Sequence, residues 1–327
     1  MSAYLRWMAG GTVFIFVLYG LYCYTAGKKR GVWKHAWLTA LLALLFSLRI
    51  APELARVGYA LMTLELDIES YGMEALKDLF DIEITRFSFF CGGAGVVLGV
   101  LLANALTRRD AMWKGMDAFA PFGAMLVALF RLGEIAAPFY GGGHFLSDGN
   151  PLAFFPFALK IETAGGYTEW VWAVCVASAF CALACAILAF VLLRKGLRAG
   201  TVFTVTFFYL CIAQIVCESW RSEGIFWLFV HAEQVLCALT AAGILLFWIA
   251  RGERGAAFRR WSPFIIMLIC AGLAVAAEFA IDGKLFDIAP WICYVFLICL
   301  VLAMGCAGYL AAKNWEAGGK RLGVKTR

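Results

Sequence analysis

The sequence predicts an all-α, polytopic helical membrane protein with about nine transmembrane helices. Of its 327 residues, 63% are apolar and only 15% are charged, against roughly 45–50% and about 25% in soluble domains. Several stretches of about 20 residues are nearly uncharged, which is the length a helix needs to cross a hydrocarbon core of roughly 30 Å. The ten-residue alternating strand pattern of a membrane barrel is missing from the sequence. These observations exclude a soluble enzyme and a membrane barrel, and without a basic domain no nucleic-acid partner is expected.

Nine apolar segments account for the predicted spans. The first follows Arg6 and runs into Lys28-Lys29-Arg30 without a small-residue cleavage site, so it is interpreted as a retained anchor rather than a signal peptide. Residues 1–260 are predicted to form the core, and residues 261–327 an additional hairpin with a basic cytoplasmic tail. The spans cover about 8–25, 36–64, 87–106, 116–136, 170–193, 201–220, 232–250, 261–280 and 289–311.

The connections between the spans alternate in charge. One set holds 19 of the 28 Lys and Arg residues, and positively charged loops stay cytoplasmic. We therefore expect the N-terminus outside and the C-terminus inside. Two outer segments are long: residues 65–86 are predicted to form an amphipathic interfacial helix, and residues 138–168 a cap rich in glycine and aromatic residues. The basic segments are 27–35, 107–115, 194–200, 251–260 and 313–327.

Neither a metal nor a cofactor is expected. All 12 cysteines lie inside apolar segments, without paired spacing in a polar loop and without nearby histidines. This pattern indicates neither a disulfide framework nor a zinc site. His144 and His231 are interpreted as solvated loop residues rather than bases.

Two arginines lie toward the outer ends of apolar spans. Arg131 follows Lys114 by 17 residues, which corresponds to about 25 Å at 1.5 Å per helical residue. Arg221 ends the span that begins near Thr201, at about 30 Å by the same rise. An ionisable group at the bilayer centre costs roughly 2.5–3.5 kcal/mol, so we expect both guanidiniums at the outer leaflet.

Further polar residues and a glycine pair are expected at a similar depth. Gly92 and Gly93 enter the third span from the outside, soon after Arg86. Two polar stripes with i, i+4 and i+7 spacing each project from one helix face. The stripes consist of Arg49, Glu53 and Arg56 in the second span and of Gln214, Glu218 and Arg221 in the sixth.

Each of these features also has a purely structural explanation. An arginine near a helix end often extends to lipid phosphates, and a glycine pair often serves helix packing. Glu218 and Arg221 can form a structural ion pair, and Cys91 is interpreted as a small apolar filler. The coincidence of several arginines, two carboxylates and a glycine pair at one depth favours a pocket for an anionic phosphate at the outer surface.

Four motifs follow one another over roughly residues 10–250. They are Leu18-Tyr19-Gly20-Leu21; Phe89-Phe90-Cys91-Gly92-Gly93 with Gly95 and Gly99; Arg131-Leu132-Gly133-Glu134; and Glu218-Ser219-Trp220-Arg221 followed by Gln234. In this order they resemble the bacterial prolipoprotein diacylglyceryl transferase family.

The resemblance implies an enzyme at the outer face of the bacterial plasma membrane. It would move a diacylglyceryl group from phosphatidylglycerol, or a similar anionic phospholipid, to the lipobox cysteine thiol in the signal peptide of a prolipoprotein. Arg131 would bind the lipid phosphate, and Glu218 and Arg221 would shape the site, so these three are the candidate catalytic residues. The implied substrate-binding residues are Tyr19, Gly92, Gly93, Gly133, Glu134, Gln214 and Gln234.

The chain departs from the family pattern at four positions. Cys91 stands where a histidine is common, Gln214 where an arginine is expected, Glu134 in place of an asparagine and Phe139 in place of a glutamate. Loss of an arginine weakens the binding of an anionic headgroup, and Glu134 adds repulsion. The chain is therefore interpreted as a divergent member.

Two other function classes stay open. One is a non-catalytic membrane protein that binds lipid or lipoprotein on the same scaffold. The other is a small-solute transporter, which inverted repeats and broken helices at the membrane midplane would support. The sequence has neither feature, and the charges inside its spans lie near one face.

The predicted topology can be tested by cysteine labelling with an impermeant reagent in intact cells. A cysteine introduced within residues 138–168 should react from the outside, whereas a cysteine at Gly196 should be protected, because basic loops stay cytoplasmic. The control is the chain without the introduced cysteine, which measures how far the 12 native cysteines react. Labelling at position 196 together with protection within residues 138–168 would show the opposite topology.

Overall fold

The computed structural model describes residues 2–28, 35–71, 87–147, 149–162, 166–222, 224–227, 230–252, 257–281 and 289–321. Within these ranges, nine helices are long and apolar enough to cross a membrane. The predicted fold class, an all-α polytopic membrane protein, is confirmed. The helices are α1 (Ser2–Lys28), α2 (Ala36–Tyr71), α4 (Phe89–Thr107), α5 (Met112–Gly133), α7 (Val174–Leu193), α8 (Thr201–Ser219), α9 (Ala232–Arg251), α10 (Ala257–Ile281) and α11 (Pro290–Arg321).

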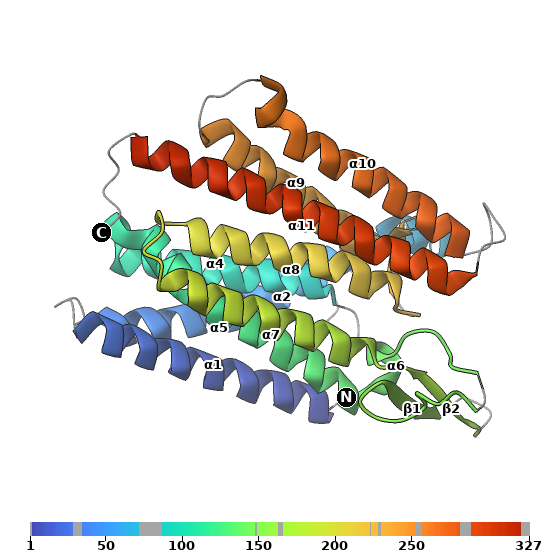
Figure 1. The fold of residues 1–327 in the computed structure, drawn as a ribbon. Helices are drawn as coiled ribbons and strands as arrows, with labels where there is room; N and C mark the ends of the chain where they lie inside the picture. The colour runs from blue at the N-terminus through green and yellow to red at the C-terminus, as the bar shows by residue number, and fades with distance from the viewer. Residues whose placement is uncertain are drawn as a thin grey trace.

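The long helices run side by side, and the two chain ends lie at opposite ends of the bundle (Figure 1). The end that holds the N-terminus also holds α6 (Pro138–Gly141) and an antiparallel pair of strands, β1 (Ala158–Glu162) and β2 (Thr168–Trp172). The segment predicted to be a cap, residues 138–168, therefore contains α6, β1 and the first residue of β2. Strand β2 continues to Trp172, so the span predicted over residues 170–193 begins as a helix only at Val174. Which end faces the outside stays a prediction.

The predicted interfacial helix over residues 65–86 differs from the structure at its start. Residues 65–71 continue α2 instead of beginning a separate helix. We predicted the end of the second span at residue 64 because acidic residues begin at Glu65. A helix can, however, continue beyond the end of its apolar segment. Residues 72–86 lie outside the described residues.

Two groups of helices each have an apolar core. Helices α1, α2, α4 and α5 bury one cluster, which includes Phe16 and Phe119. Helices α8, α9, α10 and α11 bury another, which includes Phe208, Trp248 and Met304. Helix α7 packs against α5 and α8 and joins the two groups. The predicted additional hairpin thus shares one core with α8 and α9.

Glycines allow α2 and α4 to pack closely. A Cβ atom on Gly95 would lie 2.5 Å from the Cα atom of Ala51, and a Cβ atom on Gly99 would lie 2.7 Å from the backbone nitrogen of Ser47. The side chain of Cys91 occupies the space above Gly58. Its position agrees with the interpretation of Cys91 as a packing residue.

The close approach predicts a large difference between two glycine substitutions on the same helix. Gly95→Ala should lower the free energy of unfolding by about 1–3 kcal/mol, because the new methyl group meets backbone atoms of α2. Gly93→Ala, at a position with no neighbour within 4 Å of the added Cβ, should be neutral or stabilising by up to about 1 kcal/mol. Thermal unfolding in detergent measures both, and equal stabilities would contradict the close contact.

Candidate functional site

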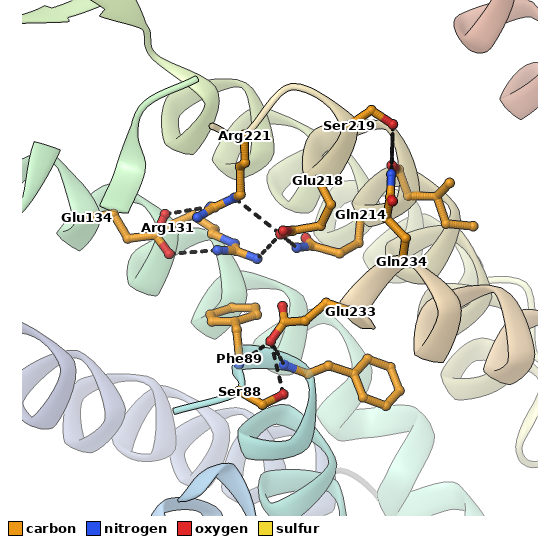
Figure 2. A network of polar contacts seen from close by, with 12 residues as sticks. Ser88, Phe89, Arg131, Glu134, Gln214, Glu218, Ser219, Arg221, Glu233 and Gln234 are labelled. Atoms are coloured by element: carbon orange, nitrogen blue, oxygen red, sulfur yellow. Dashed lines mark hydrogen bonds and ion pairs between the residues drawn. The ribbon is translucent and has the colours of Figure 1, made fainter. Parts of the chain in front are cut away.

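Four charged side chains form a closed ring at the end of the bundle that carries the cap. Glu134, in the 3₁₀ turn η4 (Glu134–Ala136) after α5, binds Arg131 at 2.6 Å through Oε1 and Arg221 at 2.7 Å through Oε2. The Oε1 atom of Glu218, near the end of α8, lies 3.2 Å from Nη2 of Arg131 and 3.2 Å from Nε of Arg221. Figure 2 shows the two carboxylates on either side of the two guanidiniums. We call these four residues the charge ring.

The charge ring is buried and electrically balanced. No side chain in it is more than 8% exposed, and its two positive charges match its two negative ones. Burial disfavours the charged form of Arg221, yet Glu134 and Glu218 raise its pKa above the usual value. The predicted pair of arginines at one depth exists, but neither guanidinium is free to take up an anion without breaking an ion pair.

A second carboxylate system lies beneath the ring. The guanidinium carbon of Arg131 lies 3.7 Å from the ring centre of Phe89. Glu233 accepts hydrogen bonds from the hydroxyl of Ser88 at 3.0 Å and from the backbone N–H groups of Phe89 at 2.6 Å and Phe90 at 3.3 Å. The start of α4 is therefore held by a carboxylate from α9, where the helix dipole favours negative charge.

Glutamines extend the network from the ring to the last hairpin. Gln214 donates to Glu218 from one turn earlier on α8. Gln234 donates to the hydroxyl of Ser219 at 2.8 Å and to Glu278 at 3.1 Å, and Ser219 also donates to Glu278. Since Glu278 belongs to α10, the hairpin that the sequence set apart from the core contacts the candidate site directly.

Glu233 and Glu278 also belong to the site, although neither is among the residues predicted from the sequence. Each is an ionisable residue inside an apolar span, which is expensive in a bilayer unless the residue has a partner or a function. That signal was present in the sequence. Their partners come from other helices, however, and only the packing of α9 and α10 brings them to the site.

The cap covers the charge ring through closely packed glycines. A Cβ atom on Gly141 would lie 3.0 Å from the Cβ of Glu134, and one on Gly143 would collide with the backbone carbonyl of Trp220. Gly143 also forms an isolated β-bridge with Arg221. This glycine segment therefore fits tightly over the ring.

An apolar cavity of about 430 Å³ adjoins the network. Its wall includes residues of α1, α2, α4, α5, α7 and α8, and it ends near the ring at Phe89 and Gln214. Its volume falls within the roughly 300–1,000 Å³ of small-molecule sites. The cavity and the charge ring are thus neighbours, separated by side chains that contact both.

The structure distributes the predicted glycines between two roles. Gly92 and Gly93 line the cavity, and Gly92 also packs against Ala55 of α2. Gly133 instead packs against Trp7 of α1, which would collide with an added Cβ. Gly133 therefore serves a helix contact in this structure rather than lining the cavity.

Tyr19 lies apart from the other candidate residues. Its side chain is fully buried against Phe119, and its hydroxyl is 3.5 Å from the backbone oxygen of Gly115. Gly115 precedes Arg131 by 16 residues, or about 24 Å along α5. The expectation that Tyr19 lines the site with Arg131 does not match this arrangement, because the first span places it beside the opposite end of α5.

Other charged and polar residues also depart from the expected arrangement. The polar stripe on α2 faces outward at Arg49, whose side chain is 80% exposed. His144 is exposed as predicted. His231 is instead buried against Phe226, and this burial lowers its pKa. The prediction of a solvated His231 is wrong because His231 lies in strand β4 (Val230–His231), whose pairing with β3 (Phe226–Trp227) places the imidazole against Phe226.

No protein-family model matches the chain, and no curated protein matches its sequence. The resemblance to diacylglyceryl transferases therefore depends on the short motifs given above. It stays a prediction.

The charge ring predicts a strong effect for removal of one charge. Glu134→Gln keeps the side-chain shape but leaves a buried guanidinium without its countercharge, which typically costs about 3–5 kcal/mol of unfolding free energy. Glu53→Gln is the matched control, because its ion pair with Arg49 is solvent-accessible and such pairs contribute about 0–1 kcal/mol. Unfolding in detergent compares the two variants, and equal losses would show that the ring is not a buried ionic unit.

Proposed function

We propose that the protein binds an anionic phospholipid within the membrane and transfers its diacylglyceryl group to the lipobox cysteine thiol of a prolipoprotein. The observation that carries this proposal is the apolar cavity that ends at Phe89 and Gln214, against the charge ring. Such a site offers acyl chains an apolar space and offers a phosphate ester nearby guanidiniums. The proposed location is the outer face of a bacterial plasma membrane.

The cavity supports lipid as the ligand class. Its wall is mostly apolar, so burial of an acyl chain there gains about 0.8 kcal/mol per buried CH₂ group. Small residues such as Gly93 leave room inside, since nothing lies within 4 Å of a Cβ placed there. A soluble polar substrate would gain little from such a wall.

The proposed reaction needs cationic groups at the leaving phosphate. The thiolate sulfur forms a bond to the glyceryl carbon, the carbon–oxygen bond to the phosphate breaks, and glycerol phosphate leaves with the electron pair. Arginines stabilise the charge that develops on this leaving group. Arg131 and Arg221 are placed to do so only if the phosphate replaces Glu134 or Glu218 as their partner.

The same exchange supplies a proton acceptor. A carboxylate released from the ring is a base without a partner, and it can take the proton that the acceptor thiol loses. Cationic surroundings also favour the thiolate over the thiol. This route needs no histidine at position 91, where the chain has a cysteine packed above Gly58.

A second candidate function is a non-catalytic membrane protein that binds lipid or lipoprotein. The balanced charge ring favours it, because both arginines are already paired. A ring that stays closed would stabilise the fold and leave the cavity as a binding site. The two functions differ in whether any diacylglyceryl group is transferred.

Transfer to a synthetic lipobox peptide from phosphatidylglycerol, measured on purified protein, tests the proposal. We expect product from the wild type. Arg131→Lys and Arg221→Lys should each lower the rate about 10- to 100-fold although the charge is kept, because lysine lacks the bidentate fork and loses a charged hydrogen bond of about 1.5–3 kcal/mol. Cys91→Ala is the control and should keep most of the activity.

Three results would change the conclusion. If the wild type transfers nothing from any anionic phospholipid, the binding protein becomes the better interpretation. Full activity of both lysine variants would remove the arginines from the chemistry. Loss of all activity in a folded Cys91→Ala protein would make Cys91 a reacting group rather than a packing residue.

A further inference from the structure

We propose that Arg56 on α2, rather than Arg131 or Arg221, binds the phosphate of the lipid whose acyl chain occupies the cavity. This inference rests on the lipid binding proposed above and names the group that recognises the headgroup. It starts from a comparison of Arg56 with Arg131 and Arg221.

Arg56 is the least compensated of these three arginines. Its nearest carboxylate oxygen among the described residues is Oε2 of Glu53, 3.9 Å from Nη2. Glu53 lies closer to Arg49, at 2.7 Å. The buried Nε atom of Arg56 has no hydrogen-bond acceptor among the described residues. A buried guanidinium nitrogen without an acceptor carries a desolvation cost that an anion would relieve.

Arg131 and Arg221 are in the opposite situation. Each contacts both Glu134 and Glu218 at 3.2 Å or less, and each is almost fully buried. An anion could approach either only by displacing a buried carboxylate. Resting recognition of a headgroup therefore falls to Arg56, and the ring can exchange partners only later, in the reaction.

Arg56 also lies at the wall of the cavity. Its side chain is part of the cavity wall together with Ser88 and Gly92, and it is about 20% exposed. The carbonyl of its neighbour Ala55 accepts a hydrogen bond from the backbone of Ser88 at 2.9 Å. Arg56 thus lies level with the start of α4, whose first N–H groups are already bound by Glu233, so the positive charge open to a ligand there is that of Arg56.

The occupant that fits is a phospholipid with an anionic headgroup. A guanidinium binds phosphate through paired hydrogen bonds, and the rest of the cavity wall is mostly apolar. A free phosphate ester would satisfy Arg56 but leave the apolar space empty. The shared chemistry is the phosphate, and the acyl chains distinguish the lipid from a soluble ester.

The test is lipid binding to purified, delipidated full-length protein, measured by native mass spectrometry. Phosphatidylglycerol and phosphatidylcholine with identical acyl chains compete for the protein. We expect the wild type to prefer phosphatidylglycerol about tenfold and Arg56→Gln to bind both lipids about equally. Arg56→Lys should keep part of the preference. Arg49→Gln is the matched control from the same polar stripe, because Arg49 is 80% exposed and is not among the residues that line the cavity.

Several outcomes would overturn the inference. If folded Arg56→Gln keeps the tenfold preference for phosphatidylglycerol, Arg56 does not bind the headgroup. The same conclusion follows if Arg49→Gln loses the preference to the same extent. A wild type without preference would remove headgroup recognition altogether. Glycerol 3-phosphate should not displace the lipid, and displacement at equal concentration would point to a free phosphate ester. If the wild type prefers phosphatidylglycerol but transfers nothing to the lipobox peptide, the proposed activity is refuted and the lipid site at Arg56 is retained.

Discussion

The buried charge ring is the interaction on which the arrangement of the two helix groups depends. It joins Arg131 and Glu134, at the end of α5, to Glu218 and Arg221, at the end of α8. At the opposite end of the same two helices, Asp117 accepts hydrogen bonds from the backbone N–H groups of Gly200, just before α8, and Phe203, in its first turn. Buried ionic groups are costly unless their geometry is satisfied. The two contacts therefore specify how α5 and α8 are aligned.

The cavity follows from this alignment. Side chains along the middle of α5 and α8 are part of its wall, while polar contacts hold the two helices together at both ends. Space left between two aligned helix groups is apolar because the spans themselves are apolar. Helix alignment alone therefore places the cavity next to a polar network, without a separate binding loop. The apolar wall is the reason for proposing lipid, rather than a polar solute, as the ligand class.

Periodicity and charge predicted the fold class well but predicted the site only in part. The apolar spans depend on local sequence, and the structure confirms them as helices. The membrane depth of Arg131 and Arg221 stays a prediction from helix rise. The pairing of both arginines with Glu134 and Glu218, and the displacement of Tyr19 toward the other end of α5, depend on helix packing. A one-dimensional pattern gives the height of a residue along its helix but not the neighbours that it meets across the bundle.

The last hairpin shows what such packing adds. Helices α10 and α11 bury a core with α8 and α9, and each contributes one carboxylate to α8. Glu278 accepts from Ser219 near its end, and Glu316 accepts from the backbone of Arg198 just before its start. Because Ser219 directly follows Glu218, a shift of α10 would move the charge ring. The hairpin therefore supports the site, because two of the carboxylates that hold α8 in place lie beyond residue 260.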